Sequence, residues 1–408
     1  MTVHGKKLTV RIVIPAVVNK YVDLLKTSCN IPTMTFNLKY NRQEWSGAFG
    51  DIGTDFPLII GMILASGLDA THILLVYGFM QILTGLIYQR PMPVQPLKAV
   101  AAIVITQKIS GSVIFGGGLA IALIMLLLTA TNTLNLISKH VPKCVVRGIQ
   151  FGLGLNLALL AMKDYVSHDG VEGYLLALVS FFIILFLLPN KKIPVALIVL
   201  GLGIIYALIF KIKSSTIATN IVFSVPVFRI PTFDEMLSGL LILAIPQVPL
   251  SLGNSILATQ QVNNDLFPNK PLTIKKIGFT YSLMNGIASC FGGVPVCHGS
   301  GGMMGHYTFG ARTGGSLLIY GGMYILLGVL FSNNLTLIKS LFPLGILGVI
   351  LLIESLALMI LAKDLSEKNE LWIALLVAVI SCSVPNGFAV GLILGVLVYK
   401  IKLFIPGK

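Results

Sequence analysis

The sequence PMPVQPLKA, residues Pro91 to Ala99, places three prolines within six residues and lies between two strongly apolar runs. A similar break, GGVPVCHGSGGMMGH at Gly292–His306, contains the same Pro-Val step about two hundred residues later. Proline cannot donate a backbone hydrogen bond, and it disfavours helix in the residue before it. These two stretches are therefore expected to interrupt helices with extended backbone.

The composition is typical of an integral membrane protein. Of the 408 residues, 55% are hydrophobic and only 11% are charged, with a mean hydropathy of +0.90, whereas soluble domains carry about 25% charged residues. The net charge of +14 would suggest nucleic acid in a soluble protein. Here membrane topology explains it, so no nucleic-acid partner is expected. The five cysteines contain no CxxC pair, which argues against a disulfide framework and a structural zinc site.

Long apolar runs recur along the chain, and a membrane crossing needs about 20 residues. We predict an all-α polytopic protein with fourteen spans, at 45–65, 71–87, 93–107, 112–137, 145–162, 172–190, 193–210, 236–260, 277–292, 296–309, 314–332, 340–362, 371–384 and 386–403. With a cytoplasmic N-terminus, the cytoplasmic segments hold 22 of the 29 Lys and Arg residues and the outer loops hold six. This excess follows the positive-inside rule, so both termini are predicted to be cytoplasmic. The predicted location is the cell (plasma) membrane.

Three pairs of segments match at offsets of 200 to 202 residues: PV at 93–94 and 295–296, DIGTD at 51–55 and SLGNS at 251–255, LALLAMKD at 157–164 and LALMILAKD at 356–364. Seven predicted spans separate the matches, and an odd number of crossings inverts the second copy. We therefore predict two inverted seven-span repeats, at 44–210 and 233–403, which is typical of transporters. The alternative is chance similarity within a biased composition.

The ends of the chain carry little further prediction. Residues 1–43 form a basic cytoplasmic segment that either lies along the membrane surface as an amphipathic stretch or forms a cytoplasmic tail. The last predicted span ends at residue 403, so no soluble C-terminal domain is expected.

The two breaks together predict an anion site. Because the repeats are inverted, the half-helices after the breaks should bring their N-termini together near the membrane midplane. Each N-terminus offers free N–H donors and a positive dipole end. The predicted substrate-binding residues are those at the breaks and nearby polar groups: Gln95, Pro96, Leu97, Lys98, His298, Gly299, Ser300, Gly301, Gln247, Asn254 and Thr54. An ordinary proline kink is the alternative.

Details within the breaks sharpen this prediction. The first half-helix is expected to start near Pro96, a residue suited to the first helical position. Gly299, Gly301 and Gly302 would let backbone amides approach a ligand closely. A structural role for His298 is an equal alternative, and Lys98 either faces the anion or pairs with an acid.

Acidic residues within spans predict a coupling role, because intramembrane charges are usually functional. Asp51 and Asp55 stand at i and i+4, so they share a helix face, and Glu354 is a second candidate. Next to an anion these carboxylates would repel it unless they were protonated or paired with a cation. This is the electrostatic logic of proton or cation coupling, and structural pairing is the alternative.

Catalysis is not predicted. The sequence contains no GxxxxGK[ST] motif for a nucleotide and no coherent catalytic set such as HExxH. Cys297 and His298 are adjacent, and adjacent residues rarely present both side chains to one point. No cofactor or metal is expected.

Four stretches closely resemble the molybdate transporter family, a branch related to the sulfate permeases: FNLKYNRQEWSGAFGDIGTDFPLIIGM, LTGLIYQRPMPVQPLKAVAA, QVPLSLGNSI and GGVPVCHGSGGMMGHYTFGARTGGS. The resemblance runs from about Phe36 to the C-terminus. It implies a seven-plus-seven inverted-repeat fold, with a core domain of spans 1–4 and 8–11 and a gate domain of spans 5–7 and 12–14.

The resemblance also implies a function. We expect a secondary active importer of a tetrahedral oxyanion, molybdate first, that works by alternating access with a proton or cation as co-substrate. The alternatives are sulfate, tungstate or another ligand on the same fold, and a passive anion channel. Homodimers are common for this fold, but no residue pattern here predicts one.

Overall fold

The computed structural model describes residues 38–134, 141–187, 195–211, 224–331 and 334–404. The first half contains one strand, β1 (Val94–Pro96). Its helices are α2 (Arg42–Ala48), α3 (Ile52–Ser66), α4 (Ala70–Tyr88), α5 (Lys98–Gln107), α6 (Gly111–Ala130), α8 (Lys143–Leu160), α9 (Gly170–Leu187) and α10 (Val195–Tyr206). Short π-helical stretches extend α8 and α10, at Ala161–Tyr165 and Ala207–Lys211. The interpretation of the basic N-terminal segment lies almost entirely outside the described residues.

The second half contains the second strand and the remaining helices. Its elements are α12 (Phe233–Gly239), α13 (Ile245–Leu250), α14 (Ala258–Leu266), α15 (Ile274–Cys290), β2 (Val296–His298), α16 (Ser300–Thr308), α17 (Gly315–Phe331), α18 (Leu335–Leu341), α19 (Leu344–Met359), α20 (Lys368–Ser383) and α21 (Gly387–Phe404). π-Helical stretches at Leu240–Ala244 and Ser251–Leu257 join α12, α13 and α14 into one long helical segment. A 3₁₀ stretch at Ile360–Asp364 extends α19.

Local sequence explains where several helices begin and end. The Asp69 side chain accepts a hydrogen bond from the backbone of His72 and caps α4. Thr232 and Glu235 form a capping box at the start of α12. Gly67 ends α3 in the left-handed conformation, with φ of 65°, which glycine adopts without steric cost.

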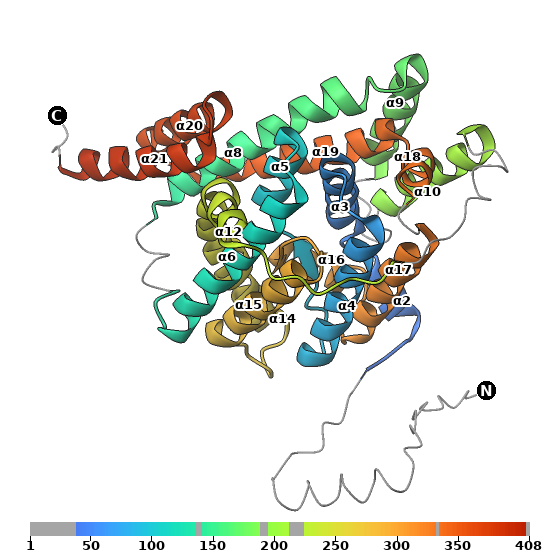
Figure 1. Cartoon of the computed structure of the whole chain (residues 1–408), viewed down its shortest axis with the longest axis horizontal. Coiled ribbons are helices and arrows are strands. Elements are labelled where there is room, and N and C mark those ends of the chain that lie inside the picture. The colour runs from blue at the N-terminus through green and yellow to red at the C-terminus, as the bar shows by residue number, and fades with distance from the viewer. Residues whose placement is uncertain (1–37, 135–140, 188–194, 212–223, 332–333, 405–408) are drawn as a thin grey trace, which may run out of the picture. The chain divides into compact units, whose positions relative to one another are not determined.

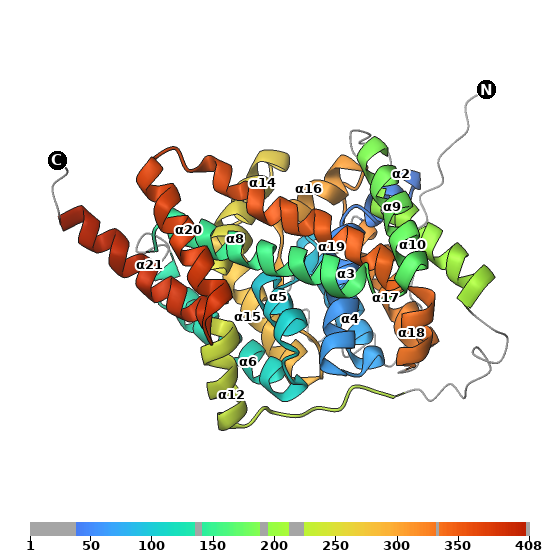
Figure 2. The same cartoon turned by 90° about the horizontal axis from the view of Figure 1, so that it is seen from above.

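The helices pack in two groups within the described unit, residues 38–404 (Figures 1 and 2). A core group contains α2–α6 and α12–α17, and a gate group contains α8–α10 and α19–α21. In the core group α4 packs on α17 and α6 on α15, so the second span of each predicted repeat contacts the fourth span of the other. In the gate group α8 packs on α19 and α20. This exchange of partners is compatible with the two inverted repeats, which stay a prediction.

Glycines allow the closest of these contacts. Gly78 and Gly85 of α4 face Gly321 of α17 and Gly314 just before it, and a side chain at any of the four positions would meet the opposing backbone. Small residues at helix interfaces let membrane helices approach until their backbones touch. The glycine content of the chain is therefore used for packing as well as for the breaks.

The structure is mostly helical, as predicted. Among the described residues, six helices are long and apolar enough to cross a membrane, or seven if α2 and α3, which are bent by 42°, count as one span. Four shorter apolar helices, including α5, accompany them. The count of fourteen spans stays a prediction. The short helix α18 lies where the sequence suggested a connecting loop.

Candidate anion site

The two proline-containing breaks form a two-stranded antiparallel sheet. Val94 pairs with His298, Gln95 with Cys297, and Pro96 with Val296. Because the strands run in opposite directions, the helices that follow them, α5 and α16, leave opposite ends of the sheet. Residues at the N-terminus of each helix line the same cavity. The extended backbone predicted at the two breaks is therefore present, and the two breaks are in direct contact.

Each strand is held on its other side by a carboxamide side chain. The Gln81 side chain accepts from the Val94 N–H at 2.9 Å and donates to the Val94 carbonyl at 2.7 Å. The Asn285 side chain does the same for Val296, at 2.9 and 2.6 Å. These buried amides satisfy backbone groups of Val94 and Val296 that would otherwise need another partner. The two contacts occupy equivalent positions in the two halves.

A cavity of about 220 Å³ lies between the two helix N-termini. Its polar lining comes from both breaks and from the facing helices: Gln95, Lys98, Gln150, Gln247, Asn254, Ser255, Cys297, Gly299, Ser300 and Gly301. Most of the predicted substrate-binding residues are thus brought together in one place. The predicted residues that do not line this cavity are Thr54, Pro96, Leu97 and His298.

His298 points away from the cavity because strand residues alternate between two faces. Cys297, its neighbour in β2, lines the cavity, while the His298 Nε2 lies 2.9 Å from the Thr280 hydroxyl and its ring packs on Tyr88. In this structure His298 therefore lies in a structural position, which was the alternative to ligand contact.

The first half-helix starts two residues later than predicted. Pro96 belongs to β1, Leu97 is the N-cap, and α5 begins at Lys98. Pro96 and Leu97 are both buried in the strand-to-helix connection, and the Leu97 N–H donates to the Pro295 carbonyl at 3.0 Å. Proline fixes the extended backbone here and does not occupy the first helical position.

The free amides of α5 are already capped by a side chain. The Gln247 Oε1 accepts from the Ala99 N–H at 3.1 Å and from the Val100 N–H at 3.3 Å, and its Nε2 donates to Ser251 at 3.0 Å. In this geometry the Ala99 and Val100 amides therefore bind a side chain. Gln247 also lines the cavity, and its role as a neutral ligand donor stays a prediction. Gln247 acts here as a cap from the core group.

The glycines of the second break have different surroundings. A Cβ atom at Gly299 would collide with the Gln95 side chain, and one at Gly302 would collide with the Asp51 carboxylate. A Cβ atom at Gly301 would meet nothing within 4 Å. Of the three glycines predicted to admit a ligand, Gly301 is the one that faces open space, whereas Gly299 and Gly302 make room for protein side chains.

Two carboxylates of the first repeat lie beside the site. Asp51 precedes α3 as its N-cap, 5% exposed, and its Oδ2 accepts from the Gln95 Nε2 at 2.6 Å. Asp55 lies in the first turn of α3, and its Oδ2 accepts from the hydroxyls of Tyr77 at 2.6 Å and Tyr320 at 3.2 Å. Asp51 thus lies at the bend between α2 and α3. The sequence had predicted it inside one continuous helix.

The third predicted acid, Glu354, joins the two helix groups. It lies on α19 of the gate group and accepts from the Thr54 hydroxyl at 2.8 Å. Its second carboxylate oxygen is 3.3 Å from the Lys98 ammonium. Lys98 therefore pairs with an acid and also lines the cavity. Pairing with an acid does not prevent it from lying beside the predicted anion site.

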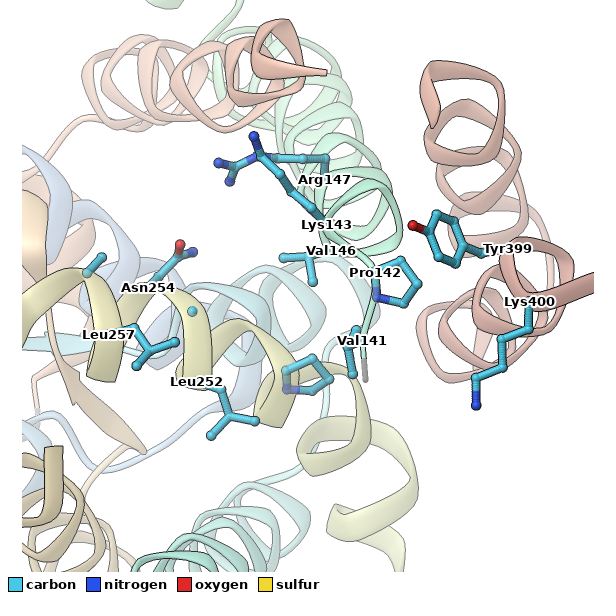
Figure 3. Close-up of a pocket in the computed structure, with 13 residues that line it drawn as sticks. Val141, Pro142, Lys143, Val146, Arg147, Leu252, Asn254, Leu257, Tyr399 and Lys400 are labelled. Atoms are coloured by element: carbon cyan, nitrogen blue, oxygen red, sulfur yellow. The ribbon is translucent and has the colours of Figure 1, made fainter. Parts of the chain in front are cut away.

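A wider pocket of about 670 Å³ adjoins the cavity on the side that the sequence predicts to be cytoplasmic (Figure 3). Lys143 and Arg147 of α8 line it from one side, Asn254 from another, and Lys400 of α21 from a third. Asn254 lines both the pocket and the cavity. The pocket therefore forms a basic vestibule next to the candidate anion site.

Several residues of the site were missed in the sequence. Gln150 of α8 lines the cavity, and Tyr77, Gln81, Asn285 and Tyr320 hold the strands and Asp55. The available signal was polarity within an apolar span, since the bilayer penalises any polar side chain without a partner. That signal was used for the charged residues and for Gln247, Asn254 and Thr54, but not for these five.

Comparison with known proteins places this geometry in a family. The family described as "Molybdate transporter of MFS superfamily" matches residues 43–157 and 239–358. Molybdate transporter 2 of Arabidopsis thaliana is 34% identical, over 86% of this chain and 86% of that protein. Molybdate transporter 1 of Arabidopsis thaliana is 30% identical, over 88% and 87%.

Solved structures share the fold. The transmembrane domain of the cyanobacterial bicarbonate transporter BicA matches with a TM-score of 0.62 at 16% identity, covering 89% of this chain and 99% of that chain. Murine Slc26a9, an anion transporter solved in the inward-facing state, matches with a TM-score of 0.66 at 16% identity, covering 97% and 74%. The predicted resemblance and the transmembrane fold are thereby confirmed, while the division into core and gate domains stays a prediction. The chain belongs to the molybdate transporter family, and it is a multi-pass membrane anion transporter and not an enzyme.

Proposed function

We propose that the protein imports molybdate by alternating access, and that tungstate and sulfate compete for the same site. The observation that carries this proposal is the cavity between the N-termini of α5 and α16, lined by Lys98, Ser300 and Gly301. A helix N-terminus favours an anion through its free N–H groups and dipole, and since Gln247 accepts from the Ala99 and Val100 amides of α5, the free amides would come mainly from α16. The family relatives are named molybdate transporters, which favours molybdate among tetrahedral dianions.

The charges around the cavity support coupling to a proton or another cation. Asp51, Asp55 and Glu354 carry three carboxylates, and the ammonium that lines the cavity within the described residues is that of Lys98. A dianion added to this set would be repelled at short range unless a positive charge arrived with it, since charge interactions are strong where water is excluded. The co-ion would neutralise a carboxylate, and the anion would then bind.

Alternating access would move the core group against the gate group. The contacts of Lys98 and Thr54 with Glu354 link the two groups next to the cavity. If the groups separate there, this ion pair must break and reform. Lys98 would then be shared between Glu354 and the bound anion, so occupancy of the site and contact between the groups would be linked.

The vestibule suggests the direction in which this geometry is open. It lies at the end predicted to be cytoplasmic, and its basic side chains would hold an anion near the site. We assign this arrangement to a cytoplasm-facing state of a plasma-membrane protein with both termini inside. The homodimer implied by the family resemblance stays a prediction.

Uptake of radiolabelled molybdate into proteoliposomes tests the proposal. We expect saturable uptake that increases with an imposed cation or pH gradient and is inhibited by excess tungstate. Ser300→Trp should abolish it by filling the cavity, whereas Ser383→Trp, at an exposed position of α20, should not. Absence of molybdate uptake and of competition by tungstate would refute the substrate assignment. A rate of uptake that does not change with any imposed cation or pH gradient would indicate a channel.

A further inference from the structure

Gln150 carries a buried amide nitrogen that has no partner and lies beside the cavity. Its side chain lies on α8 of the gate group, is 2% exposed, and is part of the cavity lining. Within the described part of the chain, the Nε2 atom has no hydrogen-bond partner. A buried NH₂ group that donates to nothing costs about 1–3 kcal/mol in other proteins. Such a group at the wall of a cavity points to a ligand that accepts hydrogen bonds.

A network behind Gln150 fixes which end of its carboxamide faces the cavity. The Arg147 Nη1 donates to the Gln150 Oε1 at 2.7 Å. Arg147 is itself held by Asp364, which accepts from its Nε at 3.0 Å and its Nη2 at 2.6 Å, and Lys143 adds a contact to Asp364 at 3.0 Å. Guanidinium groups only donate, so the carboxamide oxygen must face Arg147 and the NH₂ group must face away.

We infer that Gln150 is an oxyanion-binding residue contributed by the gate group, oriented by Arg147 and Asp364. This inference rests on the proposed function, because it assigns a further donor to the same anion. Two unpartnered N–H donors at the cavity wall suit the oxygens of a tetrahedral dianion and do not suit a cation. Since Ser300 and Gly301 lie on the core group, an anion bound by all three residues would bridge the two groups.

Binding to Gln150 gives the anion a direct influence on the gate group. A ligand shifts a conformational equilibrium only through contacts that differ between the states. A contact made by α8 is one that separation of the groups would break, whereas contacts within the core group would persist. The bound anion would therefore favour the state in which α8 lies against the cavity.

The test measures affinity for molybdate, tungstate and sulfate with purified full-length protein by equilibrium binding and by ligand-induced change in melting temperature. Gln150→Met removes the donors at nearly constant volume, and Gln150→Glu replaces them with acceptors. Gln261→Met, an exposed residue of α14 that donates to Asp265, is the matched control. Arg147→Met leaves the donors present but frees the carboxamide to turn.

We expect Gln150→Met to weaken binding of the preferred oxyanion about 10- to 100-fold, the loss typical of one charge-assisted hydrogen bond. Gln150→Glu should weaken it further, Arg147→Met less, and Gln261→Met not at all. Melting temperatures without ligand should stay close to wild type for Gln150→Met, which separates a binding role from a structural one. Wild-type affinity in Gln150→Met would overturn the inference. If wild-type protein binds sulfate but not molybdate, the proposed substrate is refuted, and the role of Gln150 can still be tested with sulfate. If it binds none of the three oxyanions, both the proposed substrate and the role of Gln150 are overturned.

Discussion

Gly301 and Gly302 are neighbours in the first turn of α16, and their surroundings predict different effects of the same substitution. In Gly302→Ala the new methyl group would lie 2.9 Å from Pro93 and still closer to the Asp51 carboxylate. Overpacking a well-packed site costs about 1–3 kcal/mol, and a carboxylate bonded to Gln95 resists displacement, so the upper part of that range applies. Replacing glycine by alanine in a helix returns up to about 1 kcal/mol, which leaves a net loss of about 1–2 kcal/mol.

Gly301→Ala should have the opposite effect on stability. Its methyl group meets nothing within 4 Å, so the gain in helix propensity remains uncompensated, at up to about 1 kcal/mol. Binding should nevertheless suffer, since the methyl group enters the cavity and displaces the anion from its donors. A loss of about tenfold corresponds to about 1.4 kcal/mol.

Both variants can be compared by thermal unfolding in detergent and by molybdate binding. At about 2 °C per kcal/mol, the lower end of the range for large domains, Gly302→Ala should melt about 2–4 °C below wild type. Gly301→Ala should melt up to about 2 °C above it and bind molybdate more weakly. Equal melting temperatures, or normal binding by Gly301→Ala, would refute the described surroundings of these glycines.

Three further predictions follow from the same contacts. Asp51→Asn and Asp55→Asn should each retain molybdate binding but lose gradient-driven accumulation in proteoliposomes; unchanged accumulation in both would remove them from coupling. Asn285→Leu should lower the free energy of unfolding by about 2–4 kcal/mol, since it leaves the N–H and carbonyl of one residue in β2 unpaired, and an unchanged melting temperature would contradict this. Lys98→Met should weaken molybdate binding at least tenfold. It should change the free energy of unfolding by about 1 kcal/mol or less, because the pair of Lys98 with Glu354 is partly exposed. A large loss of stability with normal binding would show that Lys98 has a structural role and does not bind the anion.

The breaks themselves could be predicted because proline and glycine constrain the backbone directly. Pro93 and Pro96 exclude helix over a short stretch, and the repeat of the Pro-Val step at Pro295 placed the second break. Inverted topology then followed from counting apolar runs and basic residues. Proline geometry and bilayer thickness constrain the chain locally, before any tertiary contact forms.

The direction of side chains around the breaks could not be predicted in the same way. Alternation along β2 requires Cys297 and His298 to face opposite sides, but which side faces the cavity depends on the pairing of β2 with β1 and on packing against Tyr88. Gln247 was expected to be a ligand donor, and the structure shows it capping α5. Such assignments depend on contacts between residues about 150 to 210 positions apart.

Gln150 is a further residue whose role could not be predicted from the sequence. It stands in GIQFGLG, an apolar run without prolines or charges, so it carried no local signal beyond its polarity. Its significance appears only when α8 packs against α5 and when Arg147 is seen to hold its carboxamide oxygen. Polar residues within membrane spans merit the same attention as charged ones, because both need a partner.

The most direct test of the account is to locate the bound anion. A structure of the full-length protein saturated with tungstate or molybdate would reveal the metal through its strong or anomalous scattering. We predict one tetrahedral oxyanion between Lys98, Ser300 and Gly301, within hydrogen-bond distance of the Gln150 amide. An anion bound only in the vestibule beside Lys143 and Lys400, or an empty cavity at saturating concentration, would contradict the central claim.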